Sequence, residues 1–425
     1  MATLVISAPP GQPGASLPQR FQQVRSTTLR LAAPLSAEDA MVQSMPDASP
    51  AKWHLAHTTW FFETFILSEH VAGYRPFHPD FRLLFNSYYK SLGGHPVRQQ
   101  RGTFSRPSLA DVLRYREHVD AAILRLLQEE ARTGVAAMLE LGLHHEQQHQ
   151  ELLLTDSLHA FWTQPLRPTY TQPAPLQAVS PAPLRWVSHA GGEIEIGAPA
   201  KGFAFDNERP RHKTLLAPYR LASRLVTNEE FCEFIAENGY GRPEFWLSDG
   251  WDTVCREGWT APLYWERDGD GWREFTLHGM VPLDPAEPVT HLSYYEADAF
   301  ARWAGARLPR EGEWEHAAQS TPVAGNLLES GALRPMAATA ADGAESQLYG
   351  DLWEWTASAY TGYPGFHPAP GAVGEYNGKF MCNQFVLRGG SFATSASHIR
   401  PSYRNFFPPQ ARWQFMGLRL AKDEL

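Results

Sequence analysis

The stretch HHEQQHQE, residues 144–151, determines how the first part of this chain is interpreted. The apolar residues on either side of it recur with helical rather than alternating spacing, which predicts a helix. On that helix His145 and His149 lie one turn apart on one face, which Leu152 and Asp156 continue. Two imidazoles at this spacing can hold one metal ion, although a polar helix surface rich in His and Gln has the same pattern. A metal site therefore needs a third ligand from elsewhere in the chain.

The segment SPAKWHLAHTTWFFETF, residues 49–65, predicts a second helix, because its Ser is a good N-cap and its Pro suits the first helical position. On this helix His57 shares a face with Trp53 and Trp60 and points into the apolar interior. A histidine in such a place is usually a hydrogen-bonded core residue. Opposite the first two histidines, however, His57 becomes the expected third ligand, because facing helices of a bundle build metal sites in the core.

The length of 425 residues predicts two domains, since one core rarely grows so large. Residues 1–16, rich in Pro, Gly and Ala, predict a flexible tail. Residues 17–162 predict a four-helix bundle, made of the two histidine-bearing helices and two further amphipathic segments. Residues 163–184 are proline-rich without an apolar period, which is typical of a linker. Residues 185–425 contain short strands and short capped helices punctuated by Gly and Trp, which predicts an α+β domain.

The segment that follows the second predicted helix contains two adjacent tyrosines, Tyr88 and Tyr89, and two arginines, Arg98 and Arg101. A long loop in a compact domain is often functional. A phenol near a metal can donate a proton or a hydrogen bond, and two guanidinium groups can clamp a carboxylate. Packed tyrosines and solvated arginines are the alternative, and the residues alone do not choose between the two interpretations.

The composition is that of an ordinary globular protein, 43% hydrophobic and 20% charged. The net charge of −9 argues against a nucleic-acid partner, which would need a basic face. Three scattered cysteines suit a reducing compartment, and no apolar run approaches membrane-spanning length. The first residues lack a secretory leader, so we interpret the terminal KDEL (422–425) as a coincidence. We expect a cytoplasmic protein with no nucleic-acid, membrane or obligate protein partner.

Several longer motifs carry a resemblance to known families. In the second part of the chain they are RLPREGEWEHAA (307–318), GDLWEWT (350–356), VLRGGS (386–391) and GLRLA (417–421). In the chain as a whole the most specific are SMPDASPAKWHLAHTTWFFETF (44–65), LFNSYY (84–89), HHEQQHQELLLTD (144–156) and YRNFFPP (403–409). The first part resembles DinB-like metal-binding bundles, and the second resembles the formylglycine-generating-enzyme (sulfatase-modifying-factor) fold, a relative of C-type lectins. Their fusion resembles the ergothioneine-pathway sulfoxide synthases, iron enzymes that join a sulfur donor to the imidazole of hercynine.

The resemblance implies a set of site residues and cofactors. It implies Fe(II) held by His57, His145 and His149, with O₂ as co-substrate. It places the loop tyrosines near the oxygen site, and we expect Tyr89 rather than Tyr88 to donate the proton or hydrogen bond there. It implies that the imidazole and trimethylammonium group of hercynine are held by Gln148, Asn405, Phe406 and Phe407. Aromatic faces suit a quaternary ammonium, which has no hydrogen to donate.

The chain departs from both families next to its RGGS segment. A formylglycine-generating enzyme needs cysteines there, but this chain has Phe392, Ala393 and Thr394, so modification of sulfatases is not expected. The synthases usually have Cys in place of Phe392 and a more basic loop at 95–100. These changes weaken the case for cysteine or γ-glutamylcysteine as donor and favour the sister activity, selenoneine synthase, which takes a selenosugar. Because Arg98 and Arg101 could still clamp a carboxylate, both kinds of donor stay open.

Three classes of function compete. The first is a non-haem iron synthase that forms a C–S or C–Se bond on hercynine with O₂. The second is a zinc-dependent thiol transferase or hydrolase on the DinB-like bundle, since three histidines with an open position suit Zn²⁺ equally well. The third is a lectin-like binding module without catalysis.

Overall fold

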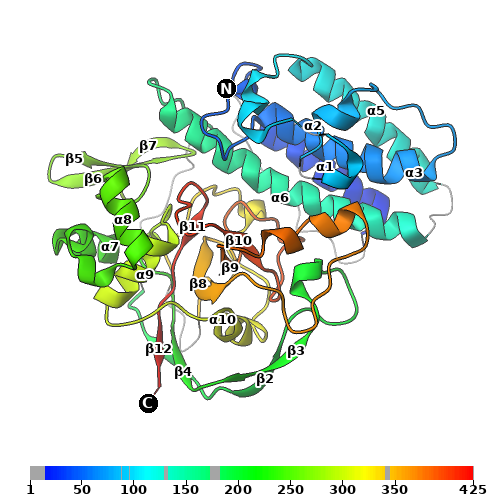
Figure 1. Ribbon diagram of the computed structural model, residues 1–425. Helices are drawn as coiled ribbons and strands as arrows, with labels where there is room; N and C mark the ends of the chain where they lie inside the picture. The colour runs from blue at the N-terminus through cyan, green and yellow to red at the C-terminus, as the bar shows by residue number, and fades with distance from the viewer. Residues whose placement is uncertain are drawn as a thin grey trace. The chain divides into compact units, whose positions relative to one another are not determined.

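The computed structural model of the protein (Figure 1) describes residues 15–87, 89–94, 96–128, 133–172, 182–339 and 345–424. The chain forms two compact units. The first comprises the chain up to Thr171 together with a returning segment, Ala369–Tyr376, and the second comprises Gln172–Pro368 and Asn377–Leu425. Nothing in the sequence pattern marks the returning segment, which lies far from the predicted linker at 163–184.

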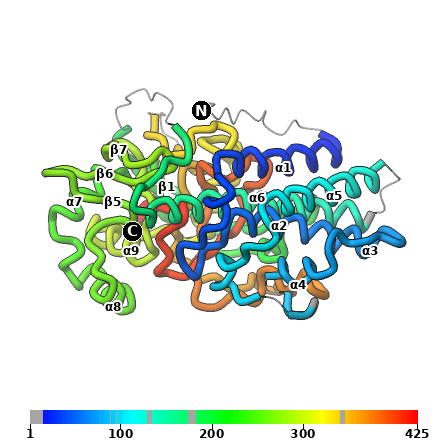
Figure 2. The backbone as a smooth tube through the Cα atoms, turned by 90° about the horizontal axis from the view of Figure 1, so that it is seen from above, coloured from blue at the N-terminus to red at the C-terminus, as the bar shows by residue number. Residues whose placement is uncertain are grey.

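The first unit is a bundle of four main helices, α1 (Leu17–Ala32), α2 (Ala51–Phe62), α5 (Leu109–Gln128) and α6 (Thr133–Thr163). A π-helical turn, Glu63–Leu67, joins α2 to the short α3 (Ser68–His70), and α4 (Phe81–Leu84) is a single turn. Helix α2 packs against both α5 and α6, and α1 packs against α6, so the four axes run side by side (Figure 2). The predicted four-helix bundle is therefore confirmed.

The starts and ends of two of these helices can be compared with the sequence. The apolar pattern of residues 17–43 predicts one helix or a broken pair, and the structure shows a break: α1 ends at Ala32, because Pro34 follows and cannot continue it, and a 3₁₀ turn at Asp39–Met41 comes next. Helix α2 begins at Ala51, so Pro50 is its N-cap and Ser49 lies just outside. Helix α6 approaches α2 closely at Gly142, where a Cβ atom would lie 2.5 Å from the Phe62 ring. This close approach brings side chains of the two helices into one shared core.

The second unit combines short strands with short helices. Its helices are α7 (Asn228–Ala236), α8 (Ser248–Glu257), α9 (Tyr294–Trp303) and α10 (Glu311–Ala318). Its strands are β1 (Trp186–His189), β2 (Gly192–Ile196), β3 (His212–Leu216), β4 (Tyr219–Ala222), β5 (Trp265–Asp268), β6 (Gly271–Thr276), β7 (Gly279–Pro282), β8 (Trp353–Ala359), β9 (Phe385–Arg388), β10 (Asn405–Phe407), β11 (Met416–Gly417) and β12 (Ala421–Asp423). Helices α7 and α9 begin at capping boxes, in which Thr227 and Ser293 accept the backbone N–H of the residue three positions on.

The strands form small sheets, in which most neighbouring strands are antiparallel. Their orders are β1-β4-β12, β10-β9-β8-β11, β2-β3 and β5-β6-β7. The parallel exception is the pair β8 and β11. Buried arginine–carboxylate pairs tie the loops together, as in Arg419 with Glu354, whose side chains are fully buried. The predicted α+β domain is confirmed. Within the described residues, no helix is long and apolar enough to span a membrane.

Candidate metal centre

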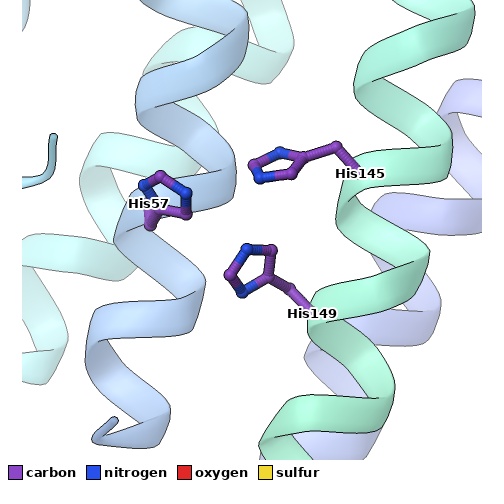
Figure 3. A group of neighbouring side chains, drawn as sticks. All are labelled: His57, His145 and His149. Atoms are coloured by element: carbon purple, nitrogen blue, oxygen red, sulfur yellow. The ribbon is translucent and has the colours of Figure 1, made fainter. Parts of the chain in front are cut away.

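Three imidazoles converge in the core of the first unit. His57 projects from α2, and His145 and His149 project from successive turns of α6 (Figure 3). One ligand atom from each of the three lies within 4.8 Å of the others, and the ring centroids are 4.6–5.0 Å apart. The structure therefore brings together the three histidines that the sequence predicted as ligands, from two facing helices.

His57 is held on three sides. Its Nδ1 lies 2.7 Å from the carbonyl oxygen of Phe85, so a neutral His57 donates its ring hydrogen there. The lone pair of Nε2 is then available to a metal ion. Its ring stacks on Trp53 and on Trp60, with centroid distances of 4.4 and 5.4 Å. The two indoles and the carbonyl fix the ring plane, which is the rigid support that a metal ligand needs.

His145 supplies the test of whether the three histidines suit a metal ion. Its side chain is buried, and neither ring nitrogen has a hydrogen-bond partner among the described residues. A buried polar atom without a partner costs about 1–3 kcal/mol, so such atoms usually have a function. A metal ion coordinated by one of these nitrogens would remove part of that cost. The residues therefore fit a metal ion.

The protonation states also suit metal binding. Burial lowers the pKa of His145 to about 3. Burial, reinforced by the neighbouring imidazoles, holds the pKa of His57 and of His149 well below the usual value. All three rings are therefore neutral at physiological pH, and only a neutral imidazole can coordinate a metal.

A buried ion cluster supports the helix that carries two of the ligands. Glu146, fully buried, accepts hydrogen bonds from Arg25 at 2.8 Å, from Arg116 at 2.8 Å and from Thr28 at 2.7 Å. Burial would raise the pKa of Glu146, but the two guanidinium charges outweigh it and lower that pKa to about 2. The cluster joins α1, α5 and α6 next to His145.

A pocket of the first unit adjoins His57 through Trp53. It is lined by Met41, Pro50, Lys52, Trp53, Phe85, Arg101, Phe104 and Pro107. Arg101 is buried, lies 3.5 Å over the Trp53 ring, and donates to the hydroxyls of Ser49 and Ser87. Lys52 donates to two backbone carbonyls of the pocket wall. Arg98, in contrast, is exposed and donates to the carbonyl of Asp47.

Of the two tyrosines predicted near the metal, the structure describes Tyr89. Tyr88 lies outside the described residues. Tyr89 is buried, and its ring contacts Trp60 at 5.5 Å and Phe65 at 5.4 Å. Because Trp60 stacks on His57, Tyr89 is one ring removed from a candidate ligand.

The returning segment adds a phenol that the sequence did not predict. Tyr376 lies edge-on to the His145 ring, with a centroid distance of 5.7 Å. Its neighbour Glu375 accepts hydrogen bonds from the backbone N–H groups of Lys90 and Ser91 at 3.1 Å, which anchors the segment on the loop next to Tyr89. No local pattern could have identified Tyr376, because its contact with α6 depends on the folding of the whole chain.

The remaining predicted residues lie on both units. Gln148 is on α6, half-buried, next to His149. Asn405, Phe406 and Phe407 form β10 of the second unit, where Phe406 stacks on Tyr360 at 4.0 Å. Their part in binding stays a prediction. Phe392, in the place of a cysteine, is buried and packs on Phe415 at 4.3 Å.

Comparisons with known proteins cover almost the whole chain. The DinB superfamily matches residues 20–153, and the sulfatase-modifying factor enzyme 1-like domain matches residues 175–346 and 343–424. Hercynine oxygenase of Mycolicibacterium thermoresistibile is 34% identical over 96% of this chain and 95% of its own length. Hercynine oxygenase of Mycobacterium tuberculosis is 35% identical over 94% of this chain and 97% of its own length. Ergothioneine biosynthesis protein 1 of Schizosaccharomyces pombe is 30% identical over 52% of this chain and 28% of its own length.

These matches agree with the predicted architecture, because the DinB model covers the bundle and the second model covers the α+β unit. The similarity to the two bacterial relatives extends through both units and nearly the full length of each protein. The chain belongs to the hercynine oxygenase family.

Proposed function

We propose that this protein is a non-haem Fe(II) enzyme that uses O₂ to form a C–S or C–Se bond on the imidazole of hercynine. The observation that carries the proposal is the group of three converging, neutral imidazoles, of which His57 and His145 are buried and His145 has no hydrogen-bond partner among the described residues. Hercynine is the proposed substrate because relatives that are similar over almost their whole length are named hercynine oxygenases. Fe(II) bound by His57, His145 and His149 would supply the redox chemistry with O₂.

The proposed reaction balances with O₂ as the sole oxidant. For a sulfoxide product, the C–H bond of an imidazole carbon and the S–H bond of the donor break, and a C–S bond forms. One oxygen atom of O₂ bonds to sulfur, and the other leaves as water with the two hydrogens. A selenol donor gives the same balance. The protein must hold both substrates next to each other, and such proximity can lower a barrier by about 7–11 kcal/mol at best.

The contacts of the two loop arginines favour a donor without carboxylates. Both NH groups of Arg101 that would form a clamp already donate to Ser49 and Ser87, and its plane covers Trp53. Arg98 donates to Asp47. A carboxylate donor would have to share these guanidinium groups with their present partners, whereas a selenosugar would not. We therefore propose the selenosugar as the preferred donor and an amino-acid thiol as the second candidate.

The test is a donor comparison with anaerobically reconstituted Fe(II) protein. Hercynine is mixed with cysteine, γ-glutamylcysteine or a selenosugar, O₂ is admitted, and products are weighed by mass spectrometry while O₂ uptake is followed. We expect O₂ uptake and coupled product only when hercynine and a donor are both present, with the selenosugar fastest. If hercynine couples to cysteine but not to the selenosugar, the selenosugar is not the preferred donor. If hercynine couples to none of the donors, the protein is not a synthase of this kind.

The same samples separate the alternative functions. A zinc-dependent transferase or hydrolase would turn over without O₂ and with Zn²⁺ in place of Fe(II). A binding module without catalysis would keep its affinity for hercynine when His57 is replaced by Ala. We expect neither result, because relatives similar over almost their whole length are named oxygenases, and because the fixed ring of His57 is the support that a metal ligand needs.

A pair of phenylalanine variants tests which phenol takes part. We expect Tyr376→Phe to lower the rate of coupling about 100-fold, the lower end of what a positioned proton donor contributes. Tyr376 is our first candidate because its ring contacts His145, and Tyr89→Phe is the matched variant at the phenol one ring further away. Single-turnover product formation gives the two rates. If Tyr89→Phe causes the larger loss, the loop tyrosine predicted from the sequence is the donor.

A further inference from the structure

A second histidine of α2 connects one candidate ligand to a buried carboxylate. His54 lies one turn before His57, and its Nδ1 is 2.8 Å from the Nδ1 of His149. The Nε2 of His54 is 3.0 Å from Oδ2 of Asp156, which also accepts the backbone N–H of Ser49 at 2.8 Å. His54 is 2% exposed and Asp156 is 6% exposed, so water does not compete for these contacts.

The carboxylate determines the direction of this chain of hydrogen bonds. An ionised Asp156 can only accept, so the hydrogen of a neutral His54 must be on Nε2. The Nδ1 of His54 then has a lone pair and accepts from His149. His149 therefore carries its hydrogen on Nδ1, and its Nε2 is left with a lone pair. With the opposite direction, the hydrogen of His149 would be on Nε2, and that atom could not bind a metal.

We infer that His54 and Asp156 are positioning residues, which hold His149 in the tautomer and orientation that present Nε2 to a metal ion. The inference rests on the proposed function, since it needs a metal bound by His149. It parallels the role of the Phe85 carbonyl at His57, where a backbone oxygen accepts from Nδ1. Two of the three ligands are thus oriented by an acceptor at Nδ1, as metal-binding histidines generally are.

The hydrogen bonds also connect three structural elements. Asp156 is two turns beyond His149 on the same face of α6, and it accepts from the residue that precedes the N-cap of α2. The start of α2, the middle of α6 and the candidate metal centre are therefore joined through two side chains. His159, further along α6, is a suitable control, because its Nδ1 pairs with Ser44 at 2.7 Å and it is not one of the three candidate ligands.

Two isosteric variants of His54 test the direction of the chain. The oxygen of an Asn side chain can occupy the place of Nδ1 and accept from His149, whereas the nitrogen of a Gln side chain can occupy the place of Nε2 and donate to Asp156. We expect His54→Gln to bind Co²⁺ about 10- to 100-fold more weakly than the unchanged protein, the usual effect of losing a partner of a metal-bound histidine. His54→Asn should lose less, and His159→Gln should bind normally.

The measurement is competition for Co²⁺ with a coloured chelator, together with the visible spectrum of the bound ion, which reports its coordination geometry. The melting temperature of each metal-free variant shows whether it folds. If His54→Gln binds as tightly as the unchanged protein, or more tightly than His54→Asn, the inference is wrong. If the His54 variants do not fold, Asp156→Asn replaces them, with weaker Co²⁺ binding expected and unchanged binding contradicting the inference. If the unchanged protein binds no Co²⁺, the proposed function fails instead.

Discussion

His145→Ala is expected to abolish metal binding and, with it, the coupling of donor to hercynine. The side chain is one of three converging candidate ligands, and its two nitrogens have no other partner among the described residues. Two remaining histidines would hold a divalent ion weakly, because catalytic sites of this kind use three protein ligands. We expect the rate to fall at least about a thousandfold, since proximity on the proposed metal would lower the barrier by several kcal/mol.

Metal content after dialysis, measured by mass spectrometry, and single-turnover coupling provide the two readouts. His159→Ala is the control, because it removes a partly buried imidazole from the same helix without touching the three ligands. A His145→Ala protein that retains one iron per chain and couples at the normal rate would refute the assignment of this residue.

Glu146→Gln is expected to cost about 3–5 kcal/mol of stability in the first unit, the usual effect of leaving a buried charge without its partner. Arg116 is buried and would face a neutral amide instead of a carboxylate, while Arg25 would keep Asp120, 2.7 Å away. The effect is large because no solvent reaches the cluster. In contrast, Glu140→Gln, which breaks the partly exposed pair with Arg20, should cost no more than about 1 kcal/mol.

Hydrogen exchange of the α6 backbone amides in the metal-free protein measures this effect, because it reports the opening of one unit separately from the rest of the chain. The exchange of the slowest amides should accelerate strongly in Glu146→Gln and little in Glu140→Gln. Equal acceleration in the two variants would mean that the buried cluster contributes no more than a surface pair.

The convergence of the three histidines could be predicted from the sequence because helical periodicity determines which residues share a face. His145 and His149 are one turn apart, and His57 faces the interior of its own helix, so no long-range information was needed. The same periodicity placed Asp156 on the face of His149. It did not identify His54 as the residue that connects His149 to Asp156. That contact depends on how α2 is rotated against α6, and periodicity within one helix does not determine the rotation. The close approach of the two helices at Gly142 is part of the same packing.

Other parts of the site depend on contacts that no local pattern records. Tyr376 is in a segment without helical or alternating spacing, and it reaches His145 only because the chain returns to the first unit. The start of α2 was predicted one residue early, since both Ser49 and Pro50 are acceptable N-terminal residues and only the backbone geometry distinguishes them. Arg98 and Arg101 were predicted as a pair that could clamp a carboxylate of the sulfur donor, but Arg101 is buried and Arg98 is exposed.

The returning segment also determines the order in which this protein can be completed during translation. A ribosome releases α1 through α6 long before it has made Ala369–Tyr376, so the nascent bundle first exists without Glu375 on its loop and without Tyr376 beside His145. The ring contact can form only after most of the chain has been synthesised. A gene fragment that encodes the bundle alone would therefore yield a product that lacks this tyrosine permanently.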